Sequence, residues 1–296
     1  MSAHGDRWSD WVLQRSFGGD RERLEQARSE LGPIRDRVLA NAELAQGDVM
    51  LDVGAGNGLI GFGALAAVGP SGRVIFSDVS EKLVETCRNN AAEAGVLDRC
   101  EFVVAAAEDL SDVDGSSVDA VTTRSVLIYV TDKPRALAEF HRVLKPGGRL
   151  SMFEPINSFR FPPPKNLFWG YDVTAVQDLA DRVERVYRDA NPLETSPMLD
   201  FDERDLMQLA EHAGFAEVHL RYEVDVERRP VMDALSWETF AAMSGNPLEP
   251  TVQEALDAAL TPAEAHRFAG HLRPLVQRGE GQRASARAYL WARKSG

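Results

Sequence analysis

The residues with the clearest chemical meaning are glycines that follow an apolar segment. Gly54, Gly56 and Gly58 come directly after the apolar residues 49–53, and a helical pattern begins there. Glycine lets the backbone turn tightly and approach a ligand, and the start of a helix offers free N–H groups and a positive dipole end. Asp78 ends the next apolar segment, where a carboxylate can accept hydrogen bonds from a ribose diol.

Three interpretations of this loop compete. Residues 56–61 match the GxGxxG fingerprint of dinucleotide-binding proteins, which favours a nicotinamide-dependent oxidoreductase. The register is wrong for that motif, because Gly54 rather than Gly56 follows the strand, so GxGxG describes the loop better. The third interpretation is a tight turn between strand and helix that binds nothing. A motif match alone does not decide among them.

The elements that must position these residues alternate along the chain. Short apolar segments predict strands, and the segments between them have helical spacing, which is typical of a mostly parallel sheet with helices on both faces. The predicted strands are residues 49–53, 73–78, 100–104, 118–123, 149–155, 215–226 and 283–293. The predicted helices of this framework are residues 58–68, 81–94, 133–144 and 201–214, and a further helix, residues 173–190, is predicted in the insertion after the fifth strand.

Three segments stand outside the regular alternation. Residues 1–47 are charged and read as helices, residues 156–200 open as a loop rich in proline and aromatic residues, and residues 230–282 are mostly helical. We expect residues 1–47 to form an N-terminal helical lid on a main domain of residues 48–296. Within that domain, we expect the insertions 156–200 and 230–282 to form a substrate cap.

Composition limits the partners. The net charge of −13 argues against nucleic acid or an anionic membrane as the main partner, because phosphate binding requires a basic surface. Neither the two cysteines nor the six histidines have metal-binding spacing, so we expect no metal site. The cysteine content and the lack of a signal-like or membrane-spanning pattern predict a cytoplasmic protein. A homodimer is compatible with the sequence.

Four segments carry a resemblance to a known family. They are VMLDVGAGNG (49–58), GPSGRVIFSDVS (69–80), AAAEDL (105–110) and HRVLKPGGRL (141–150). In this order and spacing they resemble motifs of the class I S-adenosylmethionine-dependent methyltransferases, especially those acting on small molecules. The resemblance implies a Rossmann-like α/β fold, with a seven-stranded, mostly parallel sheet sandwiched by helices and an antiparallel last strand. It also implies S-adenosyl-L-methionine as cofactor and a small-molecule substrate.

The same resemblance implies which residues bind the methionine part of the cofactor. Gly54, Ala55 and Gly56 would pass beneath it, and Asp52 would order the loop and the amino group of the methionine. These residues all belong to the first of the four segments, which makes that segment the centre of the predicted site.

The adenosine part would be bound by residues that follow the second and third strands. Asp78 would bind the ribose hydroxyls, Val79 would flank the adenine, and Ala107 and Glu108 would meet its edge. Many relatives carry an acid where this chain has Ala106, so the adenine contacts would depend on backbone groups and on Glu108.

The methyl acceptor should lie at the carboxyl edge of the sheet, where open α/β sheets bind their ligands. Arg124 and Ser125 follow the fourth strand and would lie beside the methionine part. Methyl transfer from a sulfonium needs alignment, and a hydroxyl acceptor also needs a base. Tyr129 and Glu154 are the candidate bases, although Glu154 could instead cap nearby N–H groups.

The insertions suggest the kind of acceptor. Residues 159–171 contain five aromatic side chains around a stiff proline run, which suits an apolar or aromatic substrate. A small satellite core is the alternative. The predicted substrate-binding residues are Asn157, Phe159, Trp169, Tyr171 and Trp237.

The first expectation for the reaction is therefore O-methylation of an apolar or aromatic molecule of specialised metabolism. N- or C-methylation, and a catalytically silent module that binds the cofactor, are the alternatives.

Overall fold

A computed structural model describes residues 6–227 and 233–296, and the chain forms two compact units. The first consists of the described parts of Met1–Gln26, Phe159–Ser196 and Val224–Ser285. The second consists of Ala27–Ser158, Pro197–Glu223 and Ala286–Gly296. No helix in the described ranges is both long and apolar enough to cross a bilayer.

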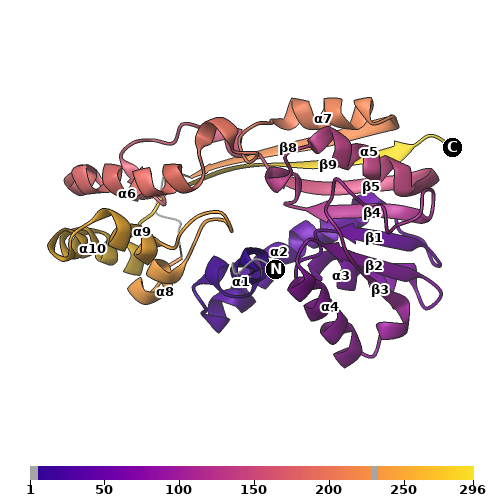
Figure 1. The fold of residues 1–296 in the computed structure, drawn as a ribbon, viewed down its shortest axis with the longest axis horizontal. Helices are drawn as coiled ribbons and strands as arrows, with labels where there is room; N and C mark the ends of the chain where they lie inside the picture. Colours follow the sequence, from indigo (N-terminus) through magenta and orange to yellow (C-terminus); the bar gives the residue numbers. More distant parts are fainter. Residues whose placement is uncertain (1–5, 228–232) are drawn as a thin grey trace. The chain divides into compact units, whose positions relative to one another are not determined.

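The framework of the second unit is a seven-stranded sheet in the order β3-β2-β1-β4-β5-β9-β8 (Figure 1). Strands β1 to β5 are parallel, and β9 runs antiparallel to β5. The predicted fold class is therefore confirmed. The strands are β1 (Val49–Val53), β2 (Arg73–Asp78), β3 (Cys100–Val104), β4 (Val118–Arg124), β5 (Leu144–Pro155), β8 (Phe215–Glu227) and β9 (Arg283–Lys294).

Helices cover both faces of this sheet because successive strand residues point to opposite sides. Met50 of β1 belongs to a core with residues of α3 (Leu59–Val68) and α4 (Glu81–Glu93). Leu51 belongs to the core formed with α5 (Lys133–Val143) and α7 (Glu203–His212). A single strand thus supplies the hydrophobic core on both sides.

Helix α2 (Arg21–Ala42) explains why the units divide inside the predicted N-terminal lid. Its residue Val38 is fully buried in the α3–α4 core, and the hydroxyl of Ser151 on β5 donates to the Val38 carbonyl at 2.7 Å. Residues 27–47 therefore belong to the second unit with the sheet.

The start of β5 differs from the prediction. The sequence pattern extends the preceding helix to Leu144 and begins the strand at Arg149, whereas α5 ends at Val143 and β5 begins at Leu144. Pro146 has no N–H for a helix, and the β4–β5 register shifts between Val118 and Ala120. The intervening residues are thus an irregular part of the strand.

The first unit is mainly helical around an aromatic core. Tyr171, Phe240 and Phe268 are fully or almost fully buried there, with Phe168 packed edge-to-face on Phe268 at 5.5 Å. The hairpin β6–β7 was not predicted, because two-residue strands leave no period to detect. The main helices and strands of the first unit are α1 (Arg7–Leu13), β6 (Leu167–Phe168), β7 (Tyr171–Asp172), α6 (Gln177–Ala190), α8 (Trp237–Ala242), α9 (Val252–Ala259) and α10 (Pro262–Gln277).

Candidate cofactor site

The glycine loop joins β1 to α3 and requires left-handed backbone at Gly54 (φ 65°) and Gly56 (φ 58°). A Cβ at Gly54 would overlap with Cγ2 of Val126, which lies in the segment after β4. A Cβ at Gly56 would meet no atom within 4 Å. Gly54 is thus required for packing inside the protein, whereas Gly56 borders open space that a ligand can use.

Asp78 joins the end of β2 to this loop. One carboxylate oxygen accepts from the Gly56 N–H and the other from the Ser80 N–H, both at 2.9 Å. Beside Asp78 in the sheet register lies Val104, and the side chains of Val79 and Val104 are 48% and 49% exposed. An exposed apolar pair next to a buried acid suits the flat face of a purine. Val104 was not predicted, although its place at the end of a strand was a usable signal.

The other residues predicted to meet the adenine lie just beyond β3. Ala107 is buried in the α5–α7 core, so its side chain is not available to a ligand. Glu108 is half-buried, and its carbonyl accepts from Nε of Arg135 at 2.8 Å. The predicted contact of Ala107 with the adenine edge would therefore use its backbone, and it stays a prediction.

Asp52 lies buried beneath the loop. Its carboxylate accepts from the Gly61 N–H of α3 and from the Thr122 hydroxyl, both at 2.9 Å. Burial raises the pKa of Asp52 to about 7, and these two hydrogen bonds oppose the rise. One oxygen therefore holds the start of α3, and the other is bonded to β4.

Glu154 is also fully buried, and its carboxylate is engaged by backbone groups. It accepts from the N–H groups of Val126 and Leu127 at 3.0 Å and of Ile128 at 3.3 Å. Burial raises its pKa to about 7 despite these bonds. The expectation that Glu154 is a free base is corrected, because its oxygens cap the 3-10 helix Leu127–Tyr129.

Arg124 ends β4 at the same edge, and Ser125 follows it. The backbone of Ser125 is left-handed (φ 56°), and its N–H donates to the Phe153 carbonyl at 2.8 Å. Arg124 is half-buried. Burial lowers its pKa, while Asp52, Glu154 and Tyr129 oppose that effect. The structure therefore brings Arg124, Tyr129 and the two buried carboxylates together.

The predicted substrate residues divide between the units. Asn157 is half-buried in the second unit, whereas Phe159, in the first, is 40% exposed. The other three, Trp169, Tyr171 and Trp237, each lie 5.7 Å from the ring of Phe240 between centroids.

Tyr171 is 0% and Trp237 6% exposed, so both are core residues of the first unit. This corrects their assignment to a substrate surface. Their apolar rings stabilise the insertion, as the satellite-core alternative proposed.

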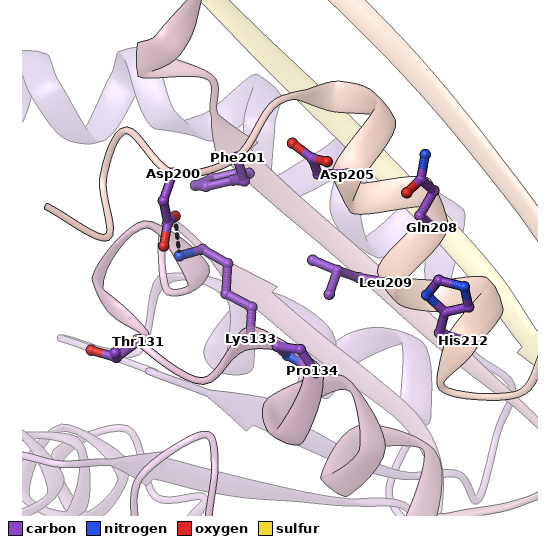
Figure 2. A pocket seen from close by; sticks show the side chains of 9 residues that line it. All are labelled: Thr131, Lys133, Pro134, Asp200, Phe201, Asp205, Gln208, Leu209 and His212. Atoms are coloured by element: carbon purple, nitrogen blue, oxygen red, sulfur yellow. Dashed lines mark hydrogen bonds and ion pairs between the residues drawn. The ribbon is translucent and has the colours of Figure 1, made fainter. Parts of the chain in front are cut away.

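A pocket of about 240 Å³ lies elsewhere in the second unit, between the start of α5 and α7 (Figure 2). Its cation Lys133 is 4% exposed and donates to the Val130 and Pro197 carbonyls and to Asp200, at 2.9, 3.0 and 2.5 Å. Lys133 is therefore occupied in holding the segment before α7. None of the predicted site residues lines this pocket, whose lining is Thr131, Lys133, Pro134, Asp200, Phe201, Asp205, Gln208, Leu209 and His212.

The carboxyl edge fits a nucleoside carrying an amino-acid chain. The loop at Gly56 leaves open space, Asp78 is fixed beside it, and Arg124 supplies a cation. Within the described ranges, no cluster of three or more His, Cys, Asp or Glu side chains could hold a metal ion. The open space, the fixed acid and the cation equip this edge to bind and orient a ligand.

Comparisons with known proteins agree with this geometry. The sequence pattern of the ubiE/COQ5 methyltransferase family matches residues 34–224. The chain is 34% identical over 171 residues to the ubiquinone/menaquinone biosynthesis C-methyltransferase UbiE of Hahella chejuensis, covering 57% of this chain and 67% of that protein.

Two solved structures share the fold. The YcgJ protein from Bacillus subtilis has a TM-score of 0.54 at 17% identity, covering 88% of this chain and 98% of that one. The cyclase SpnF has a TM-score of 0.50 at 21% identity, covering 89% and 80%. Because a cyclase shares this fold, the fold alone does not assign the reaction.

Proposed function

Because the chain belongs to the ubiE/COQ5 methyltransferase family, we propose that it methylates a ring carbon of a small hydroxylated aromatic acceptor. It is an S-adenosylmethionine-dependent methyltransferase, and S-adenosylmethionine is its cofactor. Carbon replaces oxygen as the favoured acceptor atom because the Hahella relative is named a C-methyltransferase. Specialised metabolism is not supported, since that name refers to quinone biosynthesis.

The arrangement of Asp78 and the glycine loop supports the cofactor-binding part of this proposal. Asp78 fixes the Gly56 N–H at 2.9 Å beside the exposed Val79 and Val104, so one edge offers a polar group and an apolar surface. We assign the ribose to Asp78 and the adenine to the two valines and the backbone near Glu108. Asp52, Gly54, Ala55 and Ser125 are assigned to the methionine part, and Arg124 is assigned a place beside that part, toward the acceptor.

The cofactor supplies a methyl group on a positively charged sulfur. The protein must align the acceptor carbon with that methyl group and exclude competing water. Overall, the acceptor gains the methyl group and releases one proton to solvent, and S-adenosylhomocysteine is left. Tyr129 remains a candidate for orienting the acceptor hydroxyl, because it lies near Arg124 on the loop that Glu154 caps.

The role of the first unit stays a prediction. Its described residues include the half-buried Trp169 and the exposed Phe159 and Phe161, which are the remaining aromatic candidates for contact with an acceptor. The lid and cap functions, the cytoplasmic location and a homodimer are likewise predictions.

A titration followed by an assay tests the function. S-adenosylhomocysteine at about 100 times its dissociation constant should stabilise the protein by about 2.7 kcal/mol, and NADH should not. The protein is then incubated with S-adenosylmethionine labelled in its methyl group and a set of hydroxylated aromatic compounds. Label on a ring carbon supports the proposal, label on oxygen restores the O-methylation hypothesis, and binding without transfer indicates the silent module.

A further inference from the structure

The guanidinium of Arg124 has unused hydrogen-bonding capacity. Within residues 6–227 and 233–296, it makes no hydrogen bond or ion pair, although a guanidinium carries five N–H donors. Another cation of the same unit is fully engaged, since buried Lys133 donates to two carbonyls and to Asp200. Water can hydrate a half-buried guanidinium, and a bound anion can replace that water with charge-assisted hydrogen bonds.

The two carboxylates near Arg124 do not satisfy it. Asp52 and Glu154 act on its charge through space, but their oxygens accept from Gly61, Thr122 and the backbone after β4. Because burial raises the pKa of both acids to about 7, they are only partly ionised at neutral pH. They therefore act on the charge of Arg124 without occupying its hydrogen-bond donors.

The backbone that carries Arg124 is fixed against the glycine loop. Ser125 donates to the Phe153 carbonyl at 2.8 Å, and Val126 packs so closely on Gly54 that no Cβ fits between them. A cation on this backbone is a preorganised electrostatic group at the edge assigned to the methionine part and hence to the methyl group.

We propose that Arg124 binds the ionised hydroxyl oxygen of the methyl acceptor, so that the acceptor is a phenol or enol held as its anion. This inference rests on the proposed function, because a ring carbon becomes strongly nucleophilic when a neighbouring hydroxyl is ionised. A simple phenol has a pKa of about 10, so only about one molecule in a thousand is ionised at neutral pH.

Stabilisation of the anion by a guanidinium raises the ionised fraction. The hydroxyl proton leaves to water. No proton needs to pass to Glu154, whose carboxylate is already occupied by backbone N–H groups. Arg124 thus replaces a general base with a fixed charge.

The ionisation of a bound nitrophenol, whose anion absorbs visible light, tests the proposal without turnover. With S-adenosylhomocysteine present, the protein should lower the pKa of the bound nitrophenol by about one unit or more. Arg124→Met should remove this shift, and Arg124→Lys should retain part of it.

Arg73→Met is the matched control, because Arg73 begins β2 at the opposite edge of the sheet and its side chain is 55% exposed. Arg73→Met should shift the pKa of the bound nitrophenol as the wild-type protein does. Melting curves verify that each variant is folded. A nitrophenol that does not bind saturably, or a pKa shift that survives in Arg124→Met, overturns the proposal.

A second binding comparison separates the acceptor from the cofactor carboxylate. If Arg124 holds the acceptor, Arg124→Met leaves the affinities for S-adenosylhomocysteine and for 5′-methylthioadenosine, which lacks the amino-acid part, unchanged. Weaker binding of S-adenosylhomocysteine alone would assign Arg124 to the cofactor carboxylate and overturn the proposal. Lack of ring methylation together with an intact nitrophenol shift would reject the proposed function but not the anion site.

Discussion

Oε1 of Glu154 accepts a hydrogen bond from the backbone N–H of Leu127 at 3.0 Å. This bond connects the end of β5 to the 3-10 helix that follows β4, and two neighbouring N–H groups reinforce it. The side chain that the sequence offers as a base is thereby a structural cap. Its value lies in holding the loop that contains Tyr129 and begins next to Arg124.

Glu154→Gln should therefore reduce stability more than chemistry. The amide can replace the oxygen that faces Val126 and Leu127, but its NH₂ would face the Ile128 N–H, so we expect a loss of about 1–3 kcal/mol in unfolding free energy. Turnover measured well below the melting temperature should fall less than about tenfold, whereas loss of a general base costs about 10²–10⁴. A fall in that larger range, with the fold intact, would return Glu154 to the role of base.

The raised pKa of Asp52 predicts how stability changes with pH. The folded protein keeps the proton of Asp52 up to about pH 7, whereas the unfolded chain loses it near the ordinary aspartate pKa of 3.8. Unfolding free energy should therefore decrease as pH rises through this window, by up to about 1.4 kcal/mol per pH unit for each such group. Glu154, also raised to about 7, contributes in the same direction.

Asp52→Asn isolates the share of Asp52 in this pH dependence. An asparagine can accept from the Gly61 N–H while its NH₂ donates to a rotated Thr122 hydroxyl, so both contacts persist. Denaturant titrations between pH 4.5 and 8 should show a shallower decline for this variant. An identical slope in both proteins would mean that Asp52 titrates normally.

The two glycines of the loop should respond differently to alanine. Gly54→Ala should destabilise the fold by more than the cost of left-handed backbone, about 1–2 kcal/mol, because its Cβ overlaps Val126. Gly56→Ala carries only that cost, but its Cβ enters the space assigned to the cofactor and should weaken S-adenosylhomocysteine binding. Calorimetry and thermal melting together distinguish the two effects.

Gly95→Ala is the control for backbone strain. Gly95 has a φ of 67° and no atom within 4 Å of a Cβ, as at Gly56, but it follows α4 and lies away from the loop. It should lose similar stability and bind the ligand normally. If Gly56→Ala and Gly95→Ala bound S-adenosylhomocysteine equally well, the space above Gly56 would not be part of the site.

Asp78→Ala should weaken S-adenosylhomocysteine binding by about 10- to 100-fold, the value of a hydrogen bond to a charged group. Asp98→Ala, an exposed acid at the amino end of β3, removes the same charge at the opposite edge and should change nothing. Titration calorimetry measures both. Equal affinity in the two variants would contradict the assignment of the ribose to Asp78.

Lys133→Met should cost about 2–4 kcal/mol of unfolding free energy. The substitution removes the buried cation that donates to two carbonyls and, at 2.5 Å, to the carboxylate of Asp200. Arg73→Met breaks an exposed ion pair with Glu101 and should cost at most about 1 kcal/mol. Denaturant unfolding compares the two variants. Similar losses of unfolding free energy in the two variants would show that burial does not strengthen the contacts of Lys133.

Much of the sheet could be predicted because its signals are local. Strands β1, β2 and β3 have the predicted bounds, since each is a short apolar run that ends at glycine, a polar cap or a turn. The glycine loop and Asp78 were found for the same reason. The start of β5 was not, because its irregular register depends on pairing with β4 rather than on residues near Pro146.

The sequence by itself determined the order of the elements and the identity of the loop that carries the cofactor. Those properties follow from residue type and spacing along one segment. Only the tertiary structure decided what the acids and aromatic rings do, because burial and hydrogen-bond partners come from distant segments. Glu154 is a cap because the backbone after β4 lies against it, and Tyr171 is a core residue because Phe240 covers it. Arg124 has open donors because both nearby carboxylates are already bonded to other groups.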